Sequence, residues 1–370
     1  MIKKINIRFI ILIAFLMPAV MTWAESTVDE LRLSDVELSP GSDNEQKYAT
    51  LSVVSAARTY AAFNVDVCLP EGVEPVLNNM GRPIVRKTGI LPKDEDEYYH
   101  TLSATYYPDE RKINIICYAN PSVNFADMTG ALCRIALTAS TYAKPGKIRI
   151  GLTGQNLTTI DATKYEPEDA AYDITIGTTA KASLSVSSAN KWSTCILPFA
   201  TALPGGLKAY TCSRKDDEKG VFYLTNASSI EAYTPYILYN ESESDYSGTL
   251  TGEVDASQYP EDGKVAQGYL TGAIKKQTTH EGYVLQNKGT GVKFYLMDSG
   301  QSYTIPAGKC WATPAASTAQ SFSFDFPTAV NGIVEVAESK NESKYNLSGI
   351  MIDEPRSGQL YIQNGKKYVK

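Results

Sequence analysis

Residues 62–69 read Ala-Phe-Asn-Val-Asp-Val-Cys-Leu, and this stretch decides the fold class of the chain. Apolar side chains at positions 63, 65, 67 and 69 alternate with Asn64, Asp66 and Cys68. A period of two places one set of side chains on each face of a β-strand, so we predict a strand that buries one face. The Pro-Glu-Gly run at residues 70–72 ends this strand with a turn.

Similar runs surround this strand between residue 27 and about residue 178. Strand-like segments occupy residues 48–54, 101–107, 112–118, 131–139, 147–152 and 172–176. Turn signals containing Gly or Pro lie between many of them, a pattern typical of a β-sandwich. The 24 tyrosines of the chain also favour strands over helices.

A second unit follows, from residue 179 to about residue 328. Its aromatic and β-branched runs, at residues 192–199, 232–238, 282–286, 294–296 and 305–311, again predict antiparallel strands. Trp192 and Trp311 lie inside these apolar runs and are expected in the core. From residue 329 the chain resembles a charged linker and then resumes strand patterning up to residue 370. We therefore predict an all-β protein with two domains, at residues 25–178 and 179–328, and a short β appendage at 329–370.

The first 24 residues have the pattern of a secretory signal peptide. Three basic residues precede an apolar run at residues 9–20, and Thr-Trp-Ala at 22–24 offers a cleavage site. This run is shorter than the ~20 residues that a spanning helix needs, so we expect cleavage and no transmembrane anchor afterwards. Cleavage would leave 32 basic against 41 acidic residues, a net charge of −9. An acidic surface repels phosphate backbones, which makes nucleic acid an unsuitable partner.

Six cysteines are present, at positions 68, 117, 133, 195, 212 and 310, without CxxC or zinc-site spacing. Several lie in apolar, strand-like runs, where a free cysteine behaves as a small hydrophobe. We expect free thiols. An exported protein could also form disulfides, and Cys117–Cys133 and Cys195–Cys212 are then the candidate pairs.

The first unit resembles a cohesin-like domain. The resemblance rests on residues 33–41, 62–67, 69–73 and 130–135, in that order and spacing. It implies a jelly-roll β-sandwich. The classical partner of cohesins is the dockerin, a calcium module similar to an EF-hand. This chain has no D-x-[DN]-x-[DN]-G calcium loop, and we do not carry dockerin binding over from the resemblance.

The remaining parts resemble segments of Gram-negative surface proteins. Residues 345–349 (Tyr-Asn-Leu-Ser-Gly), 361–362 and 364–367, with Pro355 and Gly358, resemble a C-terminal segment associated with type IX secretion. Residues 179–328 resemble an uncharacterised β-rich module that occurs beside such segments. The resemblance implies export to the medium or the outer cell surface, with the secretion machinery as a partner of the C-terminal segment.

No catalytic pattern or cofactor motif emerges from the sequence. A serine hydrolase of the common type would show G-x-S-x-G, which is absent, and only two histidines exist. His100 follows the acidic run at residues 94–97 and is expected in a solvated loop, and His280 is expected in a turn. Asp66 and Glu71 flank a strand end and are the acids in the first unit to consider for a glycosidase mechanism, but we expect turn and solvent-facing roles for both.

Clustered tyrosines offer the best candidate ligand contacts. Tyr98, Tyr99, Tyr106 and Tyr107 lie near one predicted hairpin, and alternation should turn one ring of each adjacent pair inward and the other outward. We predict a non-catalytic binding or adhesion protein that is secreted or lies at the cell surface and contacts a glycan or another surface protein. The alternatives are a carbohydrate-active enzyme with paired carboxylates, and a structural spacer or assembly subunit.

Overall fold

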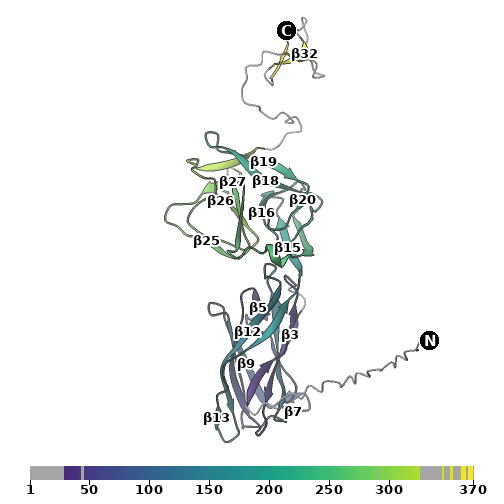
Figure 1. Ribbon diagram of the computed structural model, residues 1–370, viewed down its shortest axis with the longest axis vertical. Coiled ribbons are helices and arrows are strands. Elements are labelled where there is room, and N and C mark those ends of the chain that lie inside the picture. Colours follow the sequence, from purple (N-terminus) through teal and green to yellow (C-terminus); the bar gives the residue numbers. More distant parts are fainter. Residues whose placement is uncertain are drawn as a thin grey trace, which may run out of the picture.

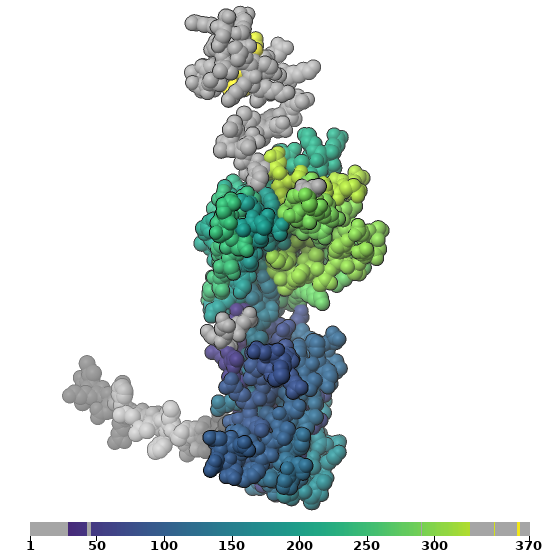
Figure 2. All heavy atoms as spheres, turned by 180° about the vertical axis from the view of Figure 1, so that it is seen from behind, coloured from purple at the N-terminus to yellow at the C-terminus, as the bar shows by residue number. Residues whose placement is uncertain are grey.

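A computed structural model describes residues 29–42, 46–289 and 291–325, together with four short strands nearer the C-terminus. The predicted signal peptide and most residues of the predicted tail lie outside the described residues. Two bodies built of strands follow one another along the long axis of the molecule (Figure 1), and Figure 2 shows the same order from behind.

The first body is a sandwich of two sheets. The first sheet contains β1 (Glu30–Leu33), β3 (Lys47–Val54), β11 (Gly130–Ala139) and β5 (Val73–Pro75), and β6 (Val85–Lys87) also pairs with β11. The second sheet runs in the order β2 (Glu37–Leu38), β14 (Ala170–Ile176), β12 (Gly146–Thr158), β4 (Ala62–Cys68), β10 (Lys112–Ala119) and β9 (His100–Tyr107), and β13 (Lys164–Tyr165) pairs with β12. A short hairpin of β7 (Lys93–Asp94) and β8 (Glu97–Tyr98) precedes β9.

Alternation along the strands builds the core of this sandwich. Phe63, Val65 and Val67 of β4 are at most 2% exposed, which confirms the strand predicted from residues 62–69. They belong to one apolar cluster with Leu51 of the first sheet and Ile113 of β10. The sandwich exists because each sheet can bury its apolar face only against the other.

The prediction for His100 is wrong. His100 begins β9 and is only 1% exposed, with Nε2 3.0 Å from the carbonyl oxygen of Ala61. Its ring centroid lies 5.2 Å from that of Phe125. The acidic run before it misled the sequence argument, because the chain turns inward again as soon as the β7–β8 hairpin ends. His280 is exposed, as expected for a turn.

The second body is dominated by one sheet of ten strands. Their order is β16 (Trp192–Cys195), β21 (Tyr236–Asn240), β18 (Leu207–Asp216), β19 (Val221–Ala227), β30 (Ser321–Asp325), β27 (Val292–Leu296), β26 (Tyr283–Asn287), β29 (Cys310–Ala312), β24 (Leu270–Ala273) and β23 (Lys264–Gln267). Three smaller pairs accompany it: β15 (Thr179–Val186) with β22 (Tyr246–Glu253), β17 (Thr201–Ala202) with β20 (Ser229–Ile230), and β25 (Gln277–Thr279) with β28 (Tyr303–Ile305). The pairing is antiparallel except between β19 and β30, which run parallel.

Aromatic side chains fill the second core. Phe222 and Phe322 stack with ring centroids 4.1 Å apart, and Phe294 meets Phe222 edge-on at 5.8 Å. Trp192 packs on Phe324 at 4.3 Å, and Trp311 is 5% exposed, so both tryptophans lie in apolar packing as expected. The only helix among the described residues is the 3-10 turn η1 (Ala256–Gln258), and the all-β prediction is confirmed.

None of the six cysteines forms a disulfide in this structure. The two candidate pairs do not face each other across neighbouring strands. Cys117 and Cys133 lie on β10 and β11, which belong to different sheets, and β21 separates the strands of Cys195 and Cys212. Sequence spacing could not show this, because it does not determine the order of strands in a sheet.

Tyr142 of the β11–β12 loop connects the two bodies. Its hydroxyl donates a hydrogen bond of 3.3 Å to the carbonyl of Ile196, and its own carbonyl accepts one of 2.9 Å from the Tyr259 hydroxyl. Burial raises the pKa of the Tyr142 phenol well above its usual value. An ion pair of 3.0 Å between Lys275 and Glu71 adds to the contact.

The C-terminal segment contains a small sheet. β31 (Lys344–Tyr345) pairs with β32 (Met351–Ile352) and β33 (Leu360–Gln363), and β33 pairs with β34 (Lys366–Val369). This agrees with the predicted β appendage.

Candidate functional site

The second sheet of the first domain carries a row of side chains that point away from the core. On β9 and β10, residues of one parity are buried or packed on the core, and residues of the other parity point outward. β4 alternates in the same way. We call these outward side chains the outer face: Asn64, Asp66, Cys68, Thr101, Ser103, Thr105, Tyr107, Lys112, Asn114, Ile116, Tyr118 and, from β12, Thr153.

A polar network holds the centre of the outer face. The Asn114 amide donates to Asn64 Oδ1 at 2.9 Å and to Asp66 Oδ1 at 2.7 Å. Lys112 Nζ lies 2.9 Å from a Glu110 carboxylate oxygen and 3.2 Å from Asp66 Oδ2. These carboxylates, Glu110 first, raise the pKa of Lys112. The network fixes side chains that would otherwise lose rotamer freedom when a ligand binds.

Two exposed apolar side chains border this network on β10. Ile116 is 42% exposed and Tyr118 is 48% exposed. They lie two residues apart on one face, a separation of about 7 Å along the strand. Ile116 is directly opposite Asn64 of β4 and Ser103 of β9. Single exposed hydrophobes are common, but an isoleucine and a tyrosine together beside a fixed polar network offer the mixture found in protein interfaces.

The four predicted tyrosines do not form one surface. Tyr98 and Tyr106 pack against the sandwich core, and burial raises the pKa of Tyr106. Tyr99 is 52% exposed and Tyr107 is 43% exposed, so one ring of each pair faces outward, as alternation predicts. Tyr99 precedes β9 and Tyr107 ends it, which places their backbones about 26 Å apart. Tyr107 alone belongs to the outer face.

Sequence reasoning missed Asn114, Ile116 and Tyr118. A signal existed in the run Ile115-Ile116-Cys117-Tyr118, where apolar residues occupy consecutive positions. Since a strand with one buried face needs only every second position to be apolar, Ile116 and Tyr118 are in excess of what the core requires. The hydrogen-bond partners of Asn114 could not be predicted from the sequence, because they come from β4, some 50 residues earlier.

The buried thiols are poorly suited to nucleophilic catalysis. Burial raises the pKa of Cys195 to about 12 and that of Cys117 to about 12 as well. A thiol is a nucleophile only as the thiolate, which such pKa values suppress near neutral pH. Asp66 is engaged by Asn114 and Lys112, and Glu71 by Lys275. Within the described residues no group of three or more His, Cys, Asp and Glu side chains could hold a metal ion.

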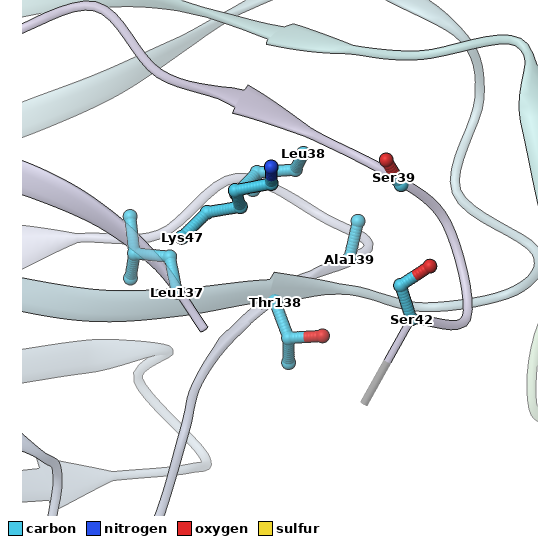
Figure 3. A pocket seen from close by; sticks show the side chains of 7 residues that line it. All are labelled: Leu38, Ser39, Ser42, Lys47, Leu137, Thr138 and Ala139. Carbon is cyan, nitrogen blue, oxygen red and sulfur yellow. The ribbon is translucent and has the colours of Figure 1, made fainter. Parts of the chain in front are cut away.

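A small indentation lies where β2 and β11 meet (Figure 3), lined by Leu38, Ser39, Ser42, Lys47, Leu137, Thr138 and Ala139. It encloses no volume that a water molecule could occupy. The hydroxyls of Ser42 and Thr138 are buried there without a hydrogen-bond partner among the described residues. Residues 43–45, which follow Ser42, are not described, so this indentation is not a candidate site.

No protein-family model and no curated protein matches the chain. Solved structures that are similar to it include cohesin modules. One is a cohesin module from a Clostridium perfringens family 33 glycoside hydrolase, with 13% identity, a TM-score of 0.30, and coverage of 40% of this chain and 94% of that one. Another is a type I cohesin–dockerin complex from Clostridium thermocellum, with 13% identity, a TM-score of 0.32, and coverage of 40% and 98%. A third is a non-cellulosomal cohesin from Archaeoglobus fulgidus, with 10% identity, a TM-score of 0.28, and coverage of 40% and 90%.

Each of these matches covers about 40% of this chain. Likeness at such TM-scores does not transfer a function. Any helix that the structure describes is too short or too polar to cross a bilayer.

Proposed function

We propose that the first domain binds another protein through the outer face, and that the chain acts without catalysis after export to the cell surface or the medium. The observation that carries the binding proposal is the position of Ile116 and Tyr118, exposed beside the fixed network of Asn64, Asp66 and Asn114. Export is proposed from the N-terminal and C-terminal sequence patterns.

Physical chemistry favours a protein over a sugar as the partner of this face. Contacts at Ile116 and Tyr118 would remove apolar surface from water, which contributes about 25 cal/mol of favourable free energy for each Å² buried. The amides and carboxylate nearby would fix the register of the partner, as polar groups do at the rim of protein interfaces. A branched aliphatic side chain such as Ile116 has little to offer the hydroxyl groups of a sugar.

Substitutions on the outer face provide the test. Changing Ile116→Lys places a charge in the centre of the proposed contact and should weaken binding at least about tenfold, the equivalent of 1.4 kcal/mol. Ile160→Lys is a matched control, because Ile160 is 54% exposed but does not belong to the outer face. Isothermal titration calorimetry of residues 25–370 with purified ligands gives the readout.

Calcium-loaded dockerin modules are the first ligands to titrate, because some of the similar structures are cohesin–dockerin complexes. Surface proteins that are recovered on immobilised wild type, but not on the Ile116→Lys variant, form the second arm. A ligand that binds both isoleucine variants equally would refute the proposed face. A glycan that binds the wild type but not the Ile116→Lys variant would show that the partner of the outer face is a glycan and not a protein.

Export has its own test. Intact mass spectrometry of the protein from the native cells should show a chain that begins after Ala24. An uncleaved chain recovered from the cytoplasm would contradict this part of the proposal and leave the binding experiment unaffected.

A further inference from the structure

A groove of about 320 Å³ lies on the second domain, on the side of β24 and β29 that carries Thr271 and Trp311. Its floor is a row of directly opposed residues, Ala266 of β23, Thr271 of β24 and Trp311 of β29. The other side of the same strands faces the aromatic core, where Leu270 and Ala312 are buried. The groove is therefore separate from that core and from the outer face of the first domain.

Small side chains on the floor leave the space open. Ala266 contributes a methyl group, and Thr271 is 5% exposed, with its hydroxyl 2.8 Å from that of Thr313. Trp311 packs against Met297 and Ile305. Because Trp311 is itself only 5% exposed, it offers the groove no broad stacking face.

The two walls carry charged groups. Asp262 lies in the turn before β23 and Lys264 begins β23, whereas Thr279 ends β25 and Glu281 lies just before β26. Gly282 has a φ of +112°, and a Cβ there would lie 3.0 Å from Trp311 Cδ1. The absence of a side chain at Gly282 lets the segment that carries Glu281 approach the indole.

This lining selects a class of ligand by its chemistry. Two carboxylates disfavour an anion, and the Lys264 ammonium disfavours a compact cation between them. Carboxylates, hydroxyls and an ammonium together can accept and donate many hydrogen bonds to a neutral molecule that carries hydroxyl groups. The volume is at the lower end of the range of about 300–1,000 Å³ that holds small ligands. A ligand of one or two rings would fit.

We propose that this groove of the second domain binds a neutral saccharide unit, held by Asp262, Lys264 and Glu281 above the floor of Ala266 and Thr271. The site is independent of the protein contact proposed for the first domain. The chain would then have two binding surfaces, one on each domain, for ligands of different chemistry.

Saturation-transfer NMR on residues 25–370 tests the proposal with glucose, galactose, mannose, N-acetylglucosamine, maltose, cellobiose and lactose. Glucuronic acid and glucosamine serve as the anionic and cationic probes. We expect at least one neutral sugar to bind, and both charged probes to bind more weakly than their neutral parent. Absence of transfer to every neutral sugar, or tighter binding of a charged probe, would overturn the proposal.

Three variants locate the site. Ala266→Trp fills the floor and should abolish binding. Asp262→Asn combined with Glu281→Gln should weaken binding about tenfold, because both substitutions replace a charged hydrogen-bond acceptor by a neutral amide. Glu243→Gln is the control, because the Glu243 side chain is 91% exposed and lies outside the groove. Each altered side chain is exposed, so the variants should keep the fold. If Ala266→Trp nevertheless fails to fold, the double variant alone tests whether the sugar binds in the groove. Binding that survives the variants unchanged refutes the site.

Discussion

Replacing Tyr142 by alanine should uncouple the two domains. Tyr142 lies in the β11–β12 loop of the first domain and makes hydrogen bonds to Ile196 and Tyr259 of the second. Burying an aromatic side chain contributes about 1.5–3 kcal/mol, and the hydroxyl bond to the Ile196 carbonyl adds about 1 kcal/mol. The substitution should therefore cost about 2.5–4 kcal/mol of the contact free energy. Tyr142→Phe, which removes only the hydroxyl, should cost about 1 kcal/mol.

Differential scanning calorimetry measures this coupling. For a domain of about 150 residues, 1 kcal/mol corresponds to about 2–4 °C in Tm, so Tyr142→Ala should lower the melting of the less stable domain by about 10 °C and separate two transitions. Tyr107→Ala is the matched control, since Tyr107 is 43% exposed and touches no residue of the second domain among the described contacts. Equal melting curves for Tyr142→Ala and Tyr107→Ala would refute the claim that this side chain joins the domains.

Three further outcomes follow from the structure. Gly308→Ala should loosen the same contact, because Gly308 has a φ of +83° and a Cβ there would overlap the Tyr142 hydroxyl. In calorimetry, Gly308→Ala and Tyr142→Ala combined should lower the stability by less than the sum of their separate effects. Burial lowers the pKa of His100 in the folded chain, so the unfolded chain takes up the proton first as the pH falls below about 6.5. The free energy of unfolding, measured by urea unfolding, should therefore decline below that pH, by at most about 1.4 kcal/mol per pH unit. His100→Gln should flatten this decline. Iodoacetamide should modify Cys68 first in the native protein, because the other five thiols are buried. Intact mass spectrometry should show one adduct, which should be absent from the Cys68→Ser variant. Rapid labelling of several cysteines would contradict the burial.

Local pattern in the sequence was sufficient to predict many of the strands, although β15, β18, β19 and β22 of the second body were missed. Alternation at residues 62–69 identified β4 and the side that it buries, and the turn signals identified most of the neighbouring strands of the sandwich. These predictions succeed because strand formation and burial follow from side chains one or two positions apart. The outward ring of each tyrosine pair followed from the same rule.

Residues that meet from distant parts of the chain depended on the tertiary structure. Asn114 reaches Asn64 and Asp66 only because β10 pairs with β4 in one particular register. Likewise Asp262, in the turn before β23, and Glu281, just before β26, line one groove although 18 positions separate them in the sequence. The order and register of strands depend on how whole faces pack together, and a one-residue slip would exchange their two sides. The sequence by itself thus determined many of the strands and which of their side chains point outward. Only the tertiary structure decided that His100 is buried and which outward side chains share a surface.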